Sequence, residues 1–167
     1  MPRLYLLLGG NLGDRVLYLQ QARAGIAKRI GILERSSSLY ETAAWGNTEQ
    51  PAFLNQVLEV QTELSPEQVL QDINMLEQEL GRVRLEHWGA RVIDIDILFY
   101  DDLVLQTQRL TIPHPQLHLR RFTLLPLAEL APELVHPVLG KSISTLLVDC
   151  PDELEVREFG AGSFDAS

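Results

Sequence analysis

The stretch "ARVIDIDILFYDD", Ala90 to Asp102, decides how we expect this chain to fold. Apolar residues dominate it, yet Asp94 and Asp96 stand in its middle, separated by one isoleucine. Side chains alternate between the two faces of a β-strand. The pattern therefore predicts a strand with its isoleucines and Phe99 on one face, and with the two aspartates and Leu98 on the other. Because unpaired carboxylates are costly to bury, we expect the aspartate face to be open.

Two amphipathic helices are expected upstream of this strand. The first follows "NLGDR" after an apolar N-terminal strand, and its helical spacing of apolar residues stops at Gly31. The second is marked more clearly, with Ser65 as N-cap, Pro66 as first helical residue and Gln68 as the capping-box partner. Gly81 supplies the expected C-terminal stop.

Extended segments lie between and after the helices. "ILERSSSLYETA" and "FLNQVLEVQTEL" read as strands, and in the latter Leu54 and Leu58 share one face while Asn55 and Val57 share the other. The resulting order, β-α-β-β-α-β, predicts a ferredoxin-like α+β fold with an antiparallel sheet and both helices on one face. A proline-punctuated C-terminal extension follows, with a helix expected near residues 122–130.

Length and composition limit the class of protein. The 167 residues suffice for one domain, which we expect over residues 1–159, with residues 160–167 as a disordered tail. A net charge of −9 argues against a nucleic-acid surface, and the single cysteine excludes an intramolecular disulfide. The apolar run near the N-terminus is too short to span a membrane, so we expect a cytoplasmic protein without a membrane partner.

The basic residues are unevenly chosen and unevenly placed. Of the 14 basic residues, twelve are arginines, and several of these lie around the aspartate pair, among them Arg82, Arg84, Arg91, Arg120 and Arg121. The guanidinium group suits bidentate contact with phosphate oxygens. An acidic protein with a local arginine cluster therefore suggests a small phosphorylated ligand, although a set of surface ion pairs would give the same composition.

The aspartate pair has the spacing of a cation site. Residues two apart on a strand place their side chains on one face, roughly 6–7 Å apart, because the rise is about 3.3 Å per residue. Two such carboxylates repel each other unless a proton or a cation intervenes, and Mg²⁺ binds through one or two carboxylates with substrate phosphates in other positions. The alternative is a pair of solvated residues on a sheet edge, but Trp88, Gly89 and the nearby arginines favour a nucleotide triphosphate site.

Two further residues fit such a ligand. His114 stands between Pro113 and Pro115, which restrict its backbone, and as a neutral donor it could bind a phosphate oxygen. The alternative is a histidine in a rigid turn. Asn55 lies on the non-core face of its strand, where its amide offers a donor and an acceptor to a heteroaromatic edge.

Over about residues 4–147 the sequence closely resembles the 6-hydroxymethyl-7,8-dihydropterin pyrophosphokinase family of the folate pathway. The most specific part is "HWGARVIDIDIL", supported by "GGNLGDR", "LGRVR", "TIPHP" and "RRFTLLPLAELAPELVHP". The resemblance implies a pyrophosphokinase domain that transfers the β,γ-pyrophosphoryl group of ATP to the pterin's hydroxymethyl oxygen and releases AMP. Two departures are an alanine at 43, where the family usually has proline, and "GGN" in place of the more common Gly-Ser-Asn.

The resemblance also implies roles for individual residues. Asp94 and Asp96 bind two Mg²⁺ ions that bridge the triphosphate, while Arg82 and Arg91 stabilise charge on the transferred group. The residues expected to bind ATP are Asn74, Glu77, Arg84, Trp88, Ile97, Arg109, Thr111, His114 and Arg120. Those expected to bind the pterin are Asn11, Thr42, Ala43, Trp45, Phe53, Asn55 and Phe122.

Two other classes of function compete with this one. Another metal-dependent enzyme that uses an Asp-x-Asp pair, such as a nucleotide-sugar transferase, would not form AMP from ATP and the pterin. A non-catalytic ferredoxin-like module would tolerate loss of either aspartate, and the net charge counts against RNA as its partner. We expect a monomer whose only partners are small-molecule substrates.

Overall fold

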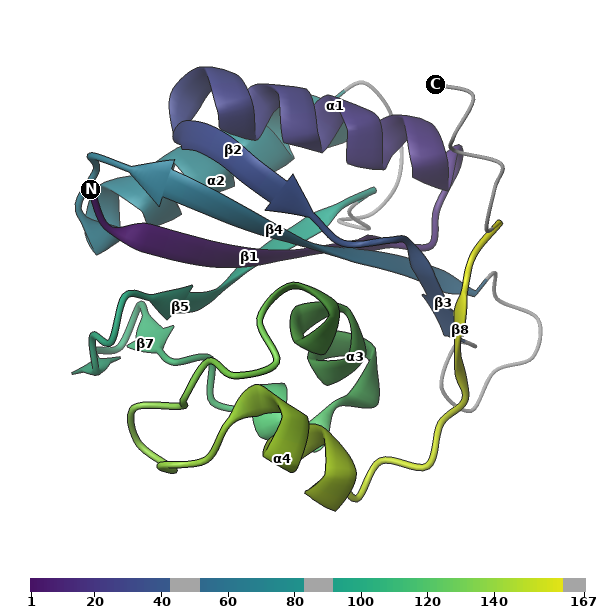
Figure 1. The fold of residues 1–167 in the computed structure, drawn as a ribbon. Coiled ribbons are helices and arrows are strands. Elements are labelled where there is room, and N and C mark those ends of the chain that lie inside the picture. The colour runs from purple at the N-terminus through teal and green to yellow at the C-terminus, as the bar shows by residue number, and fades with distance from the viewer. Residues whose placement is uncertain (43–51, 83–91, 161–167) are drawn as a thin grey trace.

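The protein is built on a six-stranded antiparallel sheet with helices on both sides (Figure 1). This computed structural model describes residues 1–42, 52–82 and 92–160. The strands of the sheet are β1 (Arg3–Gly10), β2 (Gly31–Ser36), β3 (Tyr40–Thr42), β4 (Phe53–Thr62), β5 (Asp94–Tyr100) and β8 (Val156–Glu158). Their spatial order is β5-β1-β4-β3-β8, and β2 also pairs with β4. A small separate hairpin joins β6 (Leu105–Gln106) to β7 (Thr111–Ile112).

Helices α1 (Arg15–Arg29) and α2 (Pro66–Arg82) cover one face of the sheet, as the sequence predicts. The larger core lies between them and the sheet. Leu4, Leu6 and Leu8 of β1 point into it, together with Ile95 and Ile97 of β5. These alternate positions on adjacent strands form one apolar surface, and the helices bury it.

The predicted start of α2 is confirmed in detail. The backbone N–H of Ser65 donates to Gln68 Oε1 at 2.9 Å, and the N–H of Gln68 donates to Ser65 Oγ at 3.2 Å. This reciprocal pair is a capping box. The predicted stop is wrong, because α2 includes both Gly81 and Arg82. A helical glycine costs only about 1 kcal/mol relative to alanine, so it does not by itself end a helix.

The opposite face of the sheet is covered as well, which corrects the expectation of helices on one face only. Helices α3 (Arg121–Leu130) and α4 (Ile143–Asp149), with the 3₁₀ turn η1 (Leu117–Leu119), lie against it and form a second core (Figure 1). The predicted helix near residues 122–130 is thus confirmed. Among the described residues, a cavity remains beside these helices on the aspartate face.

The pairing of β5 with β1 is irregular, and this moves one predicted core residue. Ile97 pairs with Leu6, but the next pair is Phe99 with Tyr5, so Leu98 is an additional residue in β5. Such a bulge breaks the alternation of faces. Phe99 therefore lies in the second core with Leu98, where its ring meets Tyr5 edge-on at 6.3 Å, and it does not join the isoleucines.

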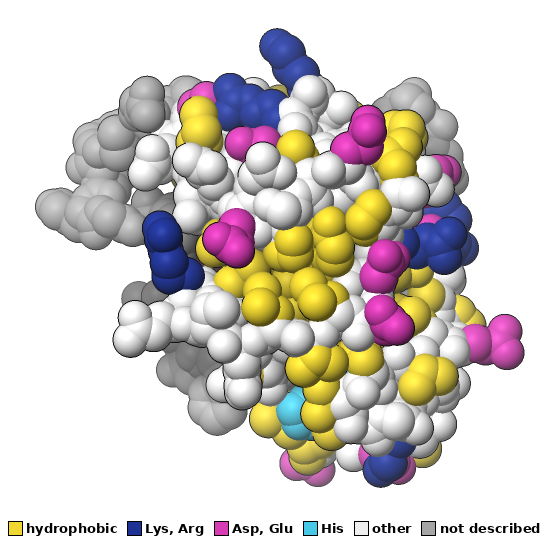
Figure 2. Space-filling view, turned by 90° about the vertical axis from the view of Figure 1, so that its left-hand side faces the viewer, with side chains coloured by type: hydrophobic (Ala, Val, Ile, Leu, Met, Phe, Trp, Pro, Cys, Tyr) yellow, Lys and Arg dark blue, Asp and Glu magenta, His cyan; other side chains and the backbone are white. Residues whose placement is uncertain are grey.

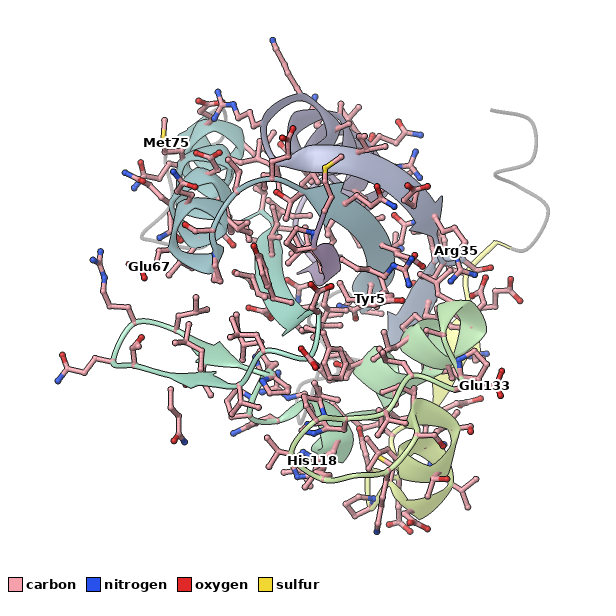
Figure 3. All side chains as sticks on the ribbon, turned by 60° about the vertical axis from the view of Figure 1, so that its left-hand side comes forward. Tyr5, Arg35, Glu67, Met75, His118 and Glu133 are labelled. Carbon is pink, nitrogen blue, oxygen red and sulfur yellow. The ribbon has the colours of Figure 1, made fainter. Side chains whose placement is uncertain are left out.

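A buried carboxylate links the two layers on the α3 side of the sheet. Glu59 of β4 is 5% exposed and accepts from the Arg35 guanidinium at 2.7 and 3.0 Å, while Arg3 lies 3.1 Å away. Arg35 also donates to the backbone oxygen of Leu130, at the end of α3. Figure 3 shows Tyr5 and Arg35 together on this side. Two cations compensate the buried charge, and one of them fastens α3 to the sheet.

Hydrophobic side chains gather across the middle of the face shown in Figure 2, on the side where β5 and β7 lie. Partly buried Leu103, Leu105 and Leu110 pack against the larger core there.

None of the helices within the described residues is both long and apolar enough to cross a membrane.

Two glycines give a matched test of this fold. An added Cβ at Gly31 would overlap the backbone oxygen of Gln61 on β4, whereas one at Gly81 would meet no described atom within 4 Å. We expect Gly31→Ala to lower the free energy of unfolding by about 1–3 kcal/mol. Gly81→Ala should raise it by about 0.5–1 kcal/mol, since alanine is the better helix former. Urea denaturation measures both; an unchanged Gly31→Ala midpoint would contradict the tight β2–β4 approach.

Candidate active site

The register of three strands sets the polar residues in rows across the sheet. Gly9 of β1 pairs with Asn55 on one side and with Asp94 on the other. In the adjacent row, Leu7 pairs with Val57 and with Asp96. Directly paired residues point to the same face, so both aspartates and Asn55 project towards the α3 side.

Gly9 is required at the centre of the first row. A Cβ added there would overlap the side-chain amide of Asn55. The glycine therefore lets Asn55 lie over β1, where its Nδ2 donates to the backbone oxygen of Leu8 at 3.4 Å. Asn55 is only 5% exposed, so its orientation is fixed by packing as well as by this bond.

These residues form the floor of a cavity of about 620 Å³, which is large enough for a drug-sized ligand. The walls come from β3, β4, the η1–α3 region and the C-terminal segment. The lining residues are Leu7, Gly9, Thr42, Phe53, Asn55, Asp94, Asp96, Gln116, Leu119, Arg120, Phe122, Pro151, Asp152 and Leu154. Because β1 lies between β5 and β4, the two aspartates lie at one end of the cavity, the acidic end, and Phe53 lies at the other, the aromatic end.

Seven of the residues predicted for the site therefore line one cavity. They are Asp94, Asp96 and Arg120 from the metal and ATP predictions, and Thr42, Phe53, Asn55 and Phe122 from the pterin predictions. Thr42 is 4% exposed, and its Oγ1 is buried with no hydrogen-bond partner among the described residues. A buried hydroxyl normally has a hydrogen-bond partner, so a bound ligand is suited to supply the partner of this atom.

Arg120 and Phe122 act as a unit at the start of α3. The Arg120 guanidinium lies 5.6 Å from the centre of the Phe122 ring and donates to Gln116 Oε1 at 2.8 Å. The ring thus helps hold a cation in the wall of the cavity. Gln116, which the sequence did not single out, orients this arginine.

His114 is half-buried, and its imidazole interacts electrostatically with two residues that line the cavity, Asp96 and Arg120. Its backbone N–H donates to the oxygen of Leu98 on β5, and its Nδ1 accepts from the Gln116 N–H at 3.2 Å. Burial lowers the pKa of the imidazole; Asp96 opposes that shift and Arg120 adds to it. The neutral ring therefore carries its proton on Nε2, which leaves Nε2 as the donor.

Glu77 of α2 supports the strand that carries the aspartates. It is 8% exposed, and its Oε2 accepts from the backbone N–H of Ile95 at 2.7 Å. Since β5 is the edge strand next to β1, the bond satisfies a donor that no further strand would pair. Its predicted contact with ATP stays a prediction.

The remaining predicted residues lie elsewhere or outside the described residues. Ile97 is in the larger core, so its side chain faces away from the cavity. Arg109 and Thr111 belong to the β6–β7 hairpin, which projects from the body in Figure 3. Half-buried Asn11 and exposed Asn74 do not line the cavity. The described residues exclude Ala43, Trp45, Arg84, Trp88, Arg91 and the side chain of Arg82.

The sequence missed the C-terminal contribution to the cavity. Pro151, Asp152 and Leu154 line it, although they come almost sixty residues after the aspartates. No periodic pattern marks them, and the strand that follows, β8, has three residues. Tertiary contacts bring them to the site: the pairing of β8 with β3, and the hydrogen bonds between Asp152 and Arg121.

Comparison with known proteins identifies the family of this chain. A family model described as 7,8-dihydro-6-hydroxymethylpterin-pyrophosphokinase (HPPK) matches residues 5–132. A Synechocystis protein named 2-amino-4-hydroxy-6-hydroxymethyldihydropteridine pyrophosphokinase is 47% identical over 146 residues, which cover 86% of this chain and 74% of that protein. The protein of the same name from Aquifex aeolicus is 43% identical over 143 residues, covering 86% and 89%.

Solved structures share the fold. Wild-type HPPK-DHPS from Plasmodium falciparum with pteroate matches with a TM-score of 0.74 at 20% sequence identity. The match covers 89% of this chain and 44% of the Plasmodium chain, so this chain spans less than half of that longer protein.

The surroundings of His114 give a titration test. In metal-free protein we expect its NMR titration midpoint below the ordinary value of 6.5. Because the folded-state pKa is the lower one, the stability that the neutral ring contributes is present above pH 6.5 and is lost as the pH falls below it.

Two substitutions test the contributions of Asp96 and Arg120 to the pKa of His114. Asp96→Asn should lower the midpoint further, whereas Arg120→Ala should raise it. A midpoint above 6.5 in the unsubstituted protein, or shifts of the opposite sign, would contradict the described placement of His114.

Proposed function

Since the chain belongs to the 7,8-dihydro-6-hydroxymethylpterin-pyrophosphokinase family, we propose that its cavity holds the triphosphate of ATP at the acidic end and the pterin at the aromatic end. The enzyme transfers pyrophosphate from ATP to the hydroxymethyl group of 6-hydroxymethyl-7,8-dihydropterin in folate biosynthesis. The hydroxymethyl oxygen bonds to the β-phosphorus, the bond from that phosphorus to the α–β bridging oxygen breaks, and AMP leaves. The hydroxyl proton is released.

The observation that carries this proposal is the presence of both strand aspartates in one cavity. Asp94 and Asp96 are half-buried on the same face of β5 and line the same space. No cluster of three or more acidic, histidine or cysteine side chains suited to a metal occurs among the described residues. Two carboxylates fit Mg²⁺, which keeps waters and takes other oxygens from substrate phosphates.

We infer that the pair holds two Mg²⁺ ions. When bound, these ions would offset the negative charge of the triphosphate, as in other phosphoryl-transfer sites. The chain's own part is positioning: the β1–β5 pairing fixes both carboxylates, and Glu77 fixes the edge of β5. Positioning of this kind supplies much of the acceleration in such reactions, because little covalent chemistry falls to the protein.

Cationic and hydrogen-bonding groups complete the nucleotide end. Arg120 lines the same cavity as the aspartates and is held by Gln116 and by the Phe122 ring. The neutral His114 offers Nε2–H to a phosphate oxygen. By family resemblance, Arg82 and Arg91 stabilise the transferred group, and Asn74, Arg84, Trp88, Arg109 and Thr111 contact the nucleotide.

The pterin end is built from flat apolar surfaces and fixed polar groups. Phe53 and Phe122 supply rings suited to stack on a planar heterocycle. Asn55 and Thr42 present polar atoms to its edge from the floor and from β3. Such a site distinguishes strongly between heterocycles, because an analogue that lacks the matching polar groups leaves buried polar atoms of the protein unpaired. By family resemblance, Asn11, Ala43 and Trp45 also belong to this end.

We further infer the wider organisation. The order β1-α1-β2-β4-α2-β5 is that of a ferredoxin-like fold, with β3 as an added strand and residues 103–160 as a C-terminal extension. Residues 1–159 form one pyrophosphokinase domain followed by a tail. We propose that the enzyme works in the cytoplasm as a monomer.

The aspartates are the first test of the proposal. Asp94→Asn and Asp96→Asn remove charge without changing size, so each should lower the rate of AMP formation by on the order of 10²–10³-fold. Each should also weaken Mg²⁺-dependent binding of a non-hydrolysable ATP analogue. Asp102→Asn is the matched control, since Asp102 is exposed on the turn after β5.

Calorimetry and an AMP assay separate the two readouts. Formation of ADP in place of AMP, or normal turnover in both aspartate variants, would refute the proposal. A change in the control of similar size would show that net charge, and not the site, is responsible.

The aromatic end is tested independently. Phe53→Leu and Phe122→Leu keep apolar volume but remove the flat π surface. We expect each to weaken pterin binding about threefold to tenfold, since stacking contributes about 0.5–1.5 kcal/mol beyond area. Affinity for the ATP analogue, measured on the same samples, is the internal control for Phe53→Leu. Equal losses for both ligands in that variant would place the pterin elsewhere.

A further inference from the structure

A segment beyond the family match closes one side of the cavity. The matching stretch ends at residue 132, yet residues 151–158, here called the C-terminal strap, run from the end of α4 past the cavity to β3 (Figure 1). Pro151, Asp152 and Leu154 of the strap line the cavity. The strap is fastened at both ends.

Asp152 fastens the strap to the first turn of α3. Its Oδ2 accepts from the backbone N–H of Arg121 at 3.0 Å, and its Oδ1 accepts from the N–H of Leu154 at 3.0 Å. The Arg121 Nε returns a bond to the Asp152 backbone oxygen at 3.1 Å. The residue at the N-cap of α3, Arg120, provides no side-chain cap of its own. Asp152 thus satisfies a helix N-terminal donor from 31 residues away, with the charge that a helix N-terminus favours.

This bond acts next to the aromatic wall. Arg121 is the residue between Arg120 and Phe122, both of which line the cavity. Holding the Arg121 N–H therefore fixes where the first turn of α3 begins, and with it the direction of the Phe122 ring. Loss of the bond would leave that turn with one fewer fixed point beside the ligand.

The other end of the strap is part of the sheet. In the β3–β8 ladder, Val156 pairs with Thr42 and Arg157 with Glu41. Just beyond, the N–H of Phe159 donates to the backbone oxygen of Leu39, and the Arg15 guanidinium lies 5.1 Å from the centre of the Phe159 ring. The strap thereby joins the Thr42 side of the cavity to the Phe122 side.

We propose that the C-terminal strap is the specificity wall of the pterin end, an inference that rests on the proposed function. Asp152 is a positioning residue that holds Phe122 towards the ring of the substrate. Leu154, half-buried in the same wall, limits the size of substituents that a planar heterocycle can carry there.

Variants of the full-length protein test the strap by comparing the change in KM for the pterin with the change in KM for ATP. We expect Asp152→Ala to raise the KM for the pterin several-fold, and the KM for ATP by a clearly smaller factor, because Arg120 stands at the same helix start. Asp152→Asn keeps one acceptor oxygen, so its KM for the pterin should lie much closer to that of the wild type. Glu153→Gln is the matched control, because Glu153 is exposed on the strap and does not line the cavity.

Leu154→Ala tests the wall without touching the cap. We expect a lower ratio of kcat/KM for the natural pterin to that for an analogue with a bulkier ring substituent, by at least about threefold. This variant decides the question if Asp152→Ala proves too unstable, and thermal unfolding checks each sample.

The outcomes separate the strap from the proposed function. A wild-type enzyme that forms no AMP from ATP and the pterin overturns the proposed function, and this inference with it. If the wild type forms AMP, two results together would overturn only the proposed role of the strap. These are an unchanged KM for the pterin in Asp152→Ala and an unchanged preference for the natural pterin in Leu154→Ala. Parallel increases in KM for both substrates, without rescue by Asp152→Asn, would also reduce the strap to a structural element.

Discussion

The site depends on the pairing of β1 with two neighbours at once. Asn55, Gly9 and Asp94 occupy one row across β4, β1 and β5, and Asp96 occupies the next row beside Leu7. A slip of one residue in either ladder would turn these side chains into the α1–α2 core, where ionised carboxylates are not tolerated. The same alternation that buries the isoleucines therefore keeps the aspartates at the cavity.

The two sides of the sheet carry different tasks. The α1–α2 side is a continuous apolar core that stabilises the strands, whereas the α3–α4 side is interrupted by the cavity. Polar ties cross that second side, among them Glu59 to Arg35 and Asp152 to the start of α3. These ties add to the apolar packing of the second core and fasten both ends of α3.

Local patterns allowed much of this to be predicted from sequence. The capping box at Ser65 and Gln68 needs only residues three apart, and the aspartate spacing needs only the period of a strand. Phe99 was placed on the wrong face because a bulge has no local signature here. Asp152 was missed because its partner, Arg121, is far along the chain, and such a contact depends on the assembled fold.

We propose that the two carboxylates of β5 hold cations, and that these cations hold the triphosphate of ATP. The most direct test of this proposal is a crystal structure of the enzyme with Mg²⁺, a non-hydrolysable ATP analogue and the reduced pterin. We expect both carboxylates to coordinate metal that also contacts phosphate oxygens, with the pterin between Phe53 and Phe122. Side chains of Asp94 and Asp96 that face solvent, with the nucleotide bound elsewhere, would contradict the account.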